Sequence, residues 1–128
     1  MSRGQFRFGY FTPLYEETVA FYRDRLGFPL IESWNRNIDD RGSLFSAASG
    51  IIEVIARPTG PSSHPWDDRP PQGAFMVVEV TDVDAFCRRV VEHRVPLAQR
   101  LTDQPWGHRS FCVMEPGGLT LSFFQEIS

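Results

Sequence analysis

A strand–helix–three-strand pattern occurs twice along this 128-residue chain, and the repetition constrains the fold more than any other feature. The first helix is predicted to follow Thr12, a helix-capping residue, with Pro13 at the first helical position and Gly27 at its end. The second is predicted to start at Asp82. Its apolar residues recur at the spacing of one helix face: Val83, Phe86, Cys87, Val90 and Val91. We therefore expect helices over about 13–26 and 82–94.

Short apolar or alternating segments, separated by turn sequences rich in Gly, Asp and Pro, predict eight strands. Four surround the first helix, at residues 5–11, 28–34, 43–48 and 51–56, and four surround the second, at 74–80, 95–101, 108–114 and 119–125. A local similarity between Val19–Leu30 and Asp84–Leu97 supports a duplication, because both share an Ala-Phe pair, arginines and a Pro-Leu strand start. We expect one α+β domain over 1–128, built from two βαβββ modules.

The segment between the modules differs in composition from both of them. Five prolines fall within residues 57–73, too many for a helix or a central strand. We therefore place a first module at about 5–57, a Pro-rich linker at about 58–73 and a second module at about 74–126.

Charge and composition exclude several classes of function. A net charge of −3 argues against nucleic-acid binding, which depends on clustered positive charge. All thirteen basic residues are arginine, which excludes a catalytic Schiff-base lysine. No signal sequence and no apolar run of membrane-spanning length is present, so we expect a cytoplasmic protein without a membrane partner.

Three segments resemble the vicinal-oxygen-chelate superfamily, which comprises glyoxalases, bleomycin-resistance proteins and ring-cleaving dioxygenases. They are AFYRDRLGF at 20–28, VTDVDAF at 80–86 and PWGHRSFCVMEPGG at 105–118, with Glu115 where the family usually has Asp. The resemblance covers nearly the whole chain. It implies the glyoxalase/bleomycin resistance/dioxygenase fold, in which curved mixed sheets surround a cleft, and it implies a homodimer.

The resemblance also identifies four positions from which the family's enzymes draw metal ligands. They correspond here to Arg7, Glu53, Phe75 and Ser122. Only Glu53 is a good ligand, because a guanidinium stays protonated and a phenyl ring has no donor atom. We therefore expect no metal and no other cofactor. We interpret Arg7 and Glu53 as an ion pair on the cleft floor or as two polar contacts for a ligand.

Other side chains are candidates for the same pocket. Strand alternation places three rings on the face of Arg7 or Ser122, and two tryptophans and a histidine lie near strand ends. The full set of predicted pocket residues is Arg7, Phe11, Trp34, Glu53, Phe75, Trp106, His108, Arg109, Ser122 and Phe124. No catalytic residue is identified, because the sequence contains no recognisable Ser-His-Asp or Cys-His arrangement. Phe6, Phe8, Tyr10, Phe21, Phe86, Leu121 and Phe123 are expected in the core.

These features favour a metal-free protein that binds an aromatic or cationic small molecule, a drug or a metabolite, in a dimeric cleft. One alternative is a metal-dependent lyase or dioxygenase of the family with displaced ligands such as Glu53 and His108. Another is an interaction module without small-molecule chemistry. Whether the protein is an enzyme therefore stays open at this stage.

Overall fold

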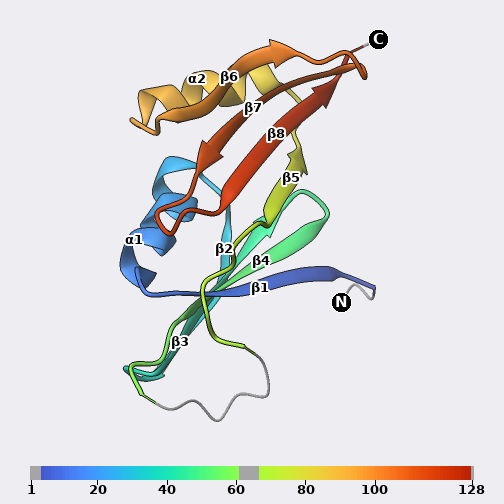
Figure 1. Cartoon of the computed structure of the whole chain (residues 1–128). Helices are drawn as coiled ribbons and strands as arrows, with labels where there is room; N and C mark the ends of the chain where they lie inside the picture. Colours follow the sequence, from blue (N-terminus) through green and yellow to red (C-terminus); the bar gives the residue numbers. More distant parts are fainter. Residues whose placement is uncertain (1–3, 61–66, 128) are drawn as a thin grey trace. The chain divides into compact units, whose positions relative to one another are not determined.

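The computed structural model describes residues 4–60 and 67–127. The chain divides between Pro71 and Gln72 into two compact units, and each unit contains one four-stranded sheet and one helical segment (Figure 1). Residues 61–66 of the predicted linker lie outside the described residues.

The first unit follows the predicted βαβββ order. Its elements are β1 (Phe6–Thr12), α1 (Tyr15–Ala20), η1 (Phe21–Arg25), β2 (Leu30–Asn37), β3 (Asp40–Ala47) and β4 (Gly50–Ala56). The strand order is β1-β4-β3-β2, in which β1 runs parallel to β4 and the other pairs are antiparallel. The helical segment connects β1 to β2, at the opposite edge of the sheet.

The second unit repeats this arrangement. Its elements are β5 (Phe75–Glu79), α2 (Val83–Glu92), β6 (Leu97–Asp103), β7 (His108–Met114) and β8 (Thr120–Glu126). The order β5-β8-β7-β6, with β5 parallel to β8, is the order of the first sheet. Both the predicted fold class and the predicted duplication of strand order are confirmed.

A buried aromatic cluster attaches the first helical segment to its sheet. Tyr22, at the start of η1, is fully buried and its ring lies 5.4 Å from that of Phe45 on β3. Its hydroxyl is 2.9 Å from that of Tyr10 on β1, so the buried polar atoms form a hydrogen bond. This packing assigns Tyr10 and Phe45 to the face of the first sheet that the helix covers.

Aromatic rings also attach α2 to the second sheet. Phe86 lies 4.8 Å from Phe123 on β8 and 6.0 Å from Phe111 on β7, measured between ring centroids. The helix starts at a capping interaction in which the Asp82 carboxylate accepts from the backbone N–H of Ala85, at 3.0 Å. The helical prediction for this segment is confirmed to within two residues at its end.

The first helical segment matches its prediction to within two residues. It begins at Tyr15 rather than Pro13, and the Thr12 hydroxyl accepts from the N–H of Leu14 in the turn before it. One core prediction for the first unit is wrong. Phe6 is not in the core: it is 70% exposed, whereas Tyr10 on the same strand face is 5% exposed. The helix contacts the Tyr10 end of β1 through Tyr22, and that contact does not extend to Phe6.

The β7–β8 turn depends on Glu115, the residue that stands where the family usually has Asp. Its side chain is 2% exposed, and its carboxylate accepts from the N–H of Leu119 at 2.7 Å. We expect Glu115→Ala to lower the free energy of unfolding by about 1.5–3 kcal/mol, because a buried charge-assisted hydrogen bond is lost. Urea unfolding measures this. Glu126→Ala, at an exposed residue at the end of β8, serves as the control. Equal stabilities of the two variants would contradict this role for Glu115.

Candidate functional site

Each sheet has one face covered by its helix and one that points away from it. We call the latter the helix-distal face. In the first unit, Tyr10 and Phe45 mark the helix side, so strand alternation places Arg7 and Phe11 of β1 on the helix-distal face. Glu53 of β4 belongs to the same face, because its register partners are Gly9 and Leu44.

The predicted ion pair between Arg7 and Glu53 is present. Arg7 Nη1 donates to Glu53 Oε1 at 3.4 Å, from side chains that are 49% and 21% exposed respectively. Gly9 lies between them on the same face, and a Cβ there would be 3.7 Å from the Glu53 side chain. The missing side chain at Gly9 leaves the pair accessible from above the sheet.

Trp34 lies on the same face, above the backbone of β3. A Cβ built on Gly42, its register partner, would overlap the Trp34 ring at Cζ2. Only a glycine therefore allows the indole to lie flat against the strand at this point. Phe11 shares the face but is 4% exposed, so it contributes to packing there.

Gly42→Ala tests the placement of Trp34. The added methyl group has to displace the indole, and we expect a loss of about 1–3 kcal/mol in stability together with a changed near-ultraviolet circular dichroism spectrum. Gly60→Ala is the control, because a Cβ at Gly60 meets nothing within 4 Å. An unchanged spectrum and melting temperature for Gly42→Ala would show that Trp34 does not lie over β3.

In the second unit, Phe111 and Phe123 face α2, so the residues that alternate with them form the helix-distal face. Ser122 and Phe124 of β8 and His108 of β7 belong to it, and the His108 ring stacks on Phe124 at 4.2 Å and 13°. Phe75 of β5 shares this face and is 67% exposed. Four residues predicted from the sequence therefore lie on one face of this sheet.

The helix-distal face of the second sheet also contains residues that the sequence analysis missed. Val77 and Met114 are exposed there, next to Ser122 and Thr120 respectively in strand register. Strand alternation from Phe75 and Ser122 would have found both. Trp106 precedes β7 and is 67% exposed.

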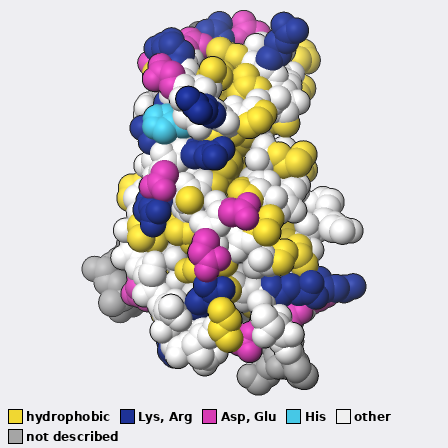
Figure 2. Space-filling view, turned by 90° about the vertical axis from the view of Figure 1, so that its left-hand side faces the viewer, with side chains coloured by type: hydrophobic (Ala, Val, Ile, Leu, Met, Phe, Trp, Pro, Cys, Tyr) yellow, Lys and Arg dark blue, Asp and Glu magenta, His cyan; other side chains and the backbone are white. Residues whose placement is uncertain are grey.

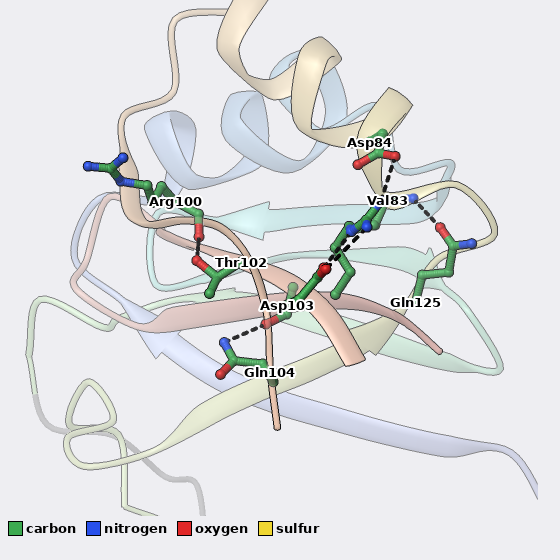
Figure 3. A network of polar contacts seen from close by, with 9 residues as sticks. Val83, Asp84, Arg100, Thr102, Asp103, Gln104 and Gln125 are labelled. Atoms are coloured by element: carbon green, nitrogen blue, oxygen red, sulfur yellow. Dashed lines mark hydrogen bonds and ion pairs between the residues drawn. The ribbon is translucent and has the colours of Figure 1, made fainter. Parts of the chain in front are cut away.

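Arg109 differs from the other predicted pocket residues. It faces the helix side of β7, where its Nε donates to Asp103 at 2.6 Å and its Nη1 to Asp84 at 3.2 Å. Asp103 is on β6 and Asp84 is in the first turn of α2 (Figure 3). Because two carboxylates hold this guanidinium on the helix side, we do not assign it to the ligand site.

The Arg109 contact predicts how stability depends on pH. The hydrogen bond from Arg109 holds the pKa of Asp103 below its ordinary value. A lowered folded-state pKa stabilises the protein above the unfolded pKa of about 3.9, and this stabilisation is lost as the pH falls through the folded value.

We therefore expect Asp103→Asn to be less stable than the parent at pH 7, with the difference shrinking as the pH falls below about 4. Urea unfolding across this range measures it. Glu79→Gln provides the control, because Glu79 makes no salt bridge in the described part of the chain. A difference for Asp103→Asn that is constant across this pH range would contradict the assignment.

The strand registers make the Arg7–Glu53 positions of the first unit equivalent to the Phe75–Ser122 positions of the second. Glu53 pairs with the residue two after Arg7, and Ser122 pairs with the residue two after Phe75. The donors do not suit a metal, because the carboxylate of Glu53 contacts Arg7 and the equivalent second-unit positions carry a ring and a hydroxyl. Across residues 4–60 and 67–127, no three His, Cys, Asp or Glu side chains gather closely enough to hold a metal ion.

The distribution of charge provides no extended basic surface on the face shown in Figure 2. Arginine side chains alternate there with Asp and Glu side chains and with hydrophobic groups. Within the residues that the structure describes, no helix is long and apolar enough to cross a membrane.

Comparison with known proteins identifies the family. The profile described as the Glyoxalase/Bleomycin resistance protein/Dioxygenase superfamily matches residues 4–123. No curated protein matches significantly.

Three solved structures share the fold. TioX from Micromonospora sp. ML1 is 20% identical, with a TM-score of 0.80 and coverage of 97% of this chain and 99% of its own. TnmS3, an antibiotic binding protein from Streptomyces sp. CB03234, is 22% identical, with a TM-score of 0.74 and coverage of 98% and 97%. Lactoylglutathione lyase from Agrobacterium tumefaciens is 15% identical, with a TM-score of 0.71 and coverage of 97% and 94%. At these identities the likeness shows the fold alone.

Proposed function

Because the chain belongs to the Glyoxalase/Bleomycin resistance protein/Dioxygenase superfamily, we propose that it is a metal-free protein that binds an aromatic small molecule on its helix-distal faces. One observation carries the proposal. The four positions that correspond to the family's metal ligands hold an Arg7–Glu53 ion pair, a phenyl ring and a hydroxyl group. In each unit taken by itself, these side chains favour contacts with an organic molecule over coordination of a metal.

The composition of the helix-distal faces supports this proposal. Small-molecule sites are mostly apolar and contain a few polar groups that fix the orientation of the ligand. The first face combines the Arg7–Glu53 pair with Trp34, and the second combines exposed Phe75 with Ser122 and the stacked His108. Aromatic side chains favour planar ligands, because rings stack or meet edge to face.

The similar structures include both binding proteins and enzymes. One is described as an antibiotic binding protein and another as a lyase, and both have nearly the same likeness to this chain. The fold therefore does not decide between binding and catalysis, and the proposal depends on the side chains. An antibiotic or a similar drug-sized aromatic molecule is the ligand that we propose.

A thermal-shift screen of aromatic and glycopeptide compounds, followed by calorimetry on the best binder, tests the proposal. We expect Phe75→Ala to weaken binding by about 1–3 kcal/mol, because an exposed ring on the helix-distal face is removed. Phe6→Ala is a matched control: Phe6 is 70% exposed, but it lies on the helix side of β1. If the two variants bind an identified ligand equally, the helix-distal face of the second sheet is not the site.

We also propose that the protein is a homodimer. Edge strands of sheets pair readily with other chains, and β2 is the outermost strand of the first sheet. It exposes two neighbouring apolar residues, Leu30 and Ile31, at 41% and 52%. A two-fold partner would cover such an edge.

Light scattering at micromolar concentration should give the mass of two chains. Ile31→Arg is expected to shift the protein toward the monomer, because a charge would be buried at the interface. Ile38→Arg, at a 62% exposed residue between β2 and β3, is expected to leave the mass unchanged. A monomeric parent protein would refute the dimer.

A further inference from the structure

In the Arg7–Glu53 pair, the guanidinium side chain is more exposed to solvent than the carboxylate side chain. The Arg7 side chain is 49% exposed and the Glu53 side chain is 21% exposed. Among residues 4–60 and 67–127, the one polar contact of the Arg7 guanidinium is that from Nη1 to Glu53, and at 3.4 Å it is long for a charged hydrogen bond. A guanidinium has five N–H donors in a planar fork, so most of its donors stay available.

Apolar residues share this face with Arg7, and one of them, Ile51, is its direct register partner. The residues that share the face on β1, β3 and β4 include Phe11, Leu44 and Ile51, which are 4%, 6% and 7% exposed. Apolar neighbours lower the local dielectric constant and strengthen a charged hydrogen bond. In the described chain, no carboxylate other than that of Glu53 lies within salt-bridge distance of Arg7.

From these observations we infer that Arg7 is the specificity-determining residue of the first helix-distal face, and that its ligand is an aromatic molecule carrying an acidic oxygen group, such as a carboxylate or a phenolate. The inference rests on the proposed function and names the class of ligand. The guanidinium stands at a position that the sequence resemblance aligns with a metal ligand of the family's enzymes. It supplies positive charge there, and its fork suits two oxygen atoms. Glu53 positions the guanidinium from below.

Three naphthalene probes of the same shape test the charge preference: 2-naphthoate, 2-naphthamide and 2-naphthylmethylammonium. By calorimetry at low salt, we expect 2-naphthoate to bind roughly tenfold or more tightly than the neutral amide, and the cation to bind most weakly. Added salt should weaken 2-naphthoate selectively. An amide or a cation that binds as tightly as the carboxylate would overturn the inference.

Variants of the pair provide the second readout. Arg7→Met keeps an unbranched, flexible side chain and removes the charge, and we expect a loss of roughly ten- to a hundredfold for 2-naphthoate with little change for the amide. Glu53→Gln should leave binding of 2-naphthoate equal or stronger, since a like charge near the ligand is removed. Arg100→Met serves as the matched control, because Arg100 is exposed and its side chain makes no salt bridge within the residues described.

Arg7→Met leaves Glu53 without its partner, so folding has to be checked. The double variant Arg7→Met/Glu53→Gln removes both charges and is expected to fold and to bind 2-naphthoate as weakly as Arg7→Met. Unchanged affinity of 2-naphthoate for the double variant would refute the role of Arg7. Absence of binding by all three probes would also refute the inference about Arg7. The proposed function is refuted by a different result: Phe75→Ala and Phe6→Ala would bind a ligand found by screening equally well.

Discussion

Each sheet of this protein has one helical segment, and one helix covers one face of a four-stranded sheet. Tyr22 packs against Phe45 in the first unit, and Phe86 packs against Phe111 and Phe123 in the second. These contacts assign every second residue of each strand to the side that the helix covers, and the core of each unit lies there. The remaining residues form a face that the helix does not cover, and this face is where the sequence has placed an ion pair, exposed rings and a stacked histidine.

On the first of these faces, the Arg7–Glu53 pair disfavours metal coordination and leaves polar groups that suit an organic ligand. A metal site needs several nitrogen or oxygen donors that converge on one point, whereas here a permanent cation occupies one donor position and engages the remaining carboxylate. The same two residues form a compact polar anchor with an accessible guanidinium. Similar folds in a lyase and an antibiotic binding protein agree with the view that such side chains, rather than the scaffold, determine function.

Much of this arrangement could be predicted from the sequence, because it depends on local periodicity. Alternation in β1 and β4 placed Arg7 and Glu53 on one face, and the family resemblance, which aligns both with metal-ligand positions, placed them at one site. Alternation identifies the face of a residue, but it does not show how far a helix extends over that face, and Phe6 was therefore wrongly assigned to the core. The partners of Arg109 were also not predictable, since Asp84 lies 25 residues away on a helix whose docking is a tertiary property.

The central claim is that binding on the helix-distal faces does not require a metal. The most direct measurement is the affinity of a ligand found by screening, determined by calorimetry on protein treated with a chelator and again after addition of Zn, Fe, Mn or Ni. We expect the same affinity in every case, because the positions that correspond to metal ligands hold Arg7, Glu53, Phe75 and Ser122. Binding that is lost on chelation and restored by one of these metals would contradict the account.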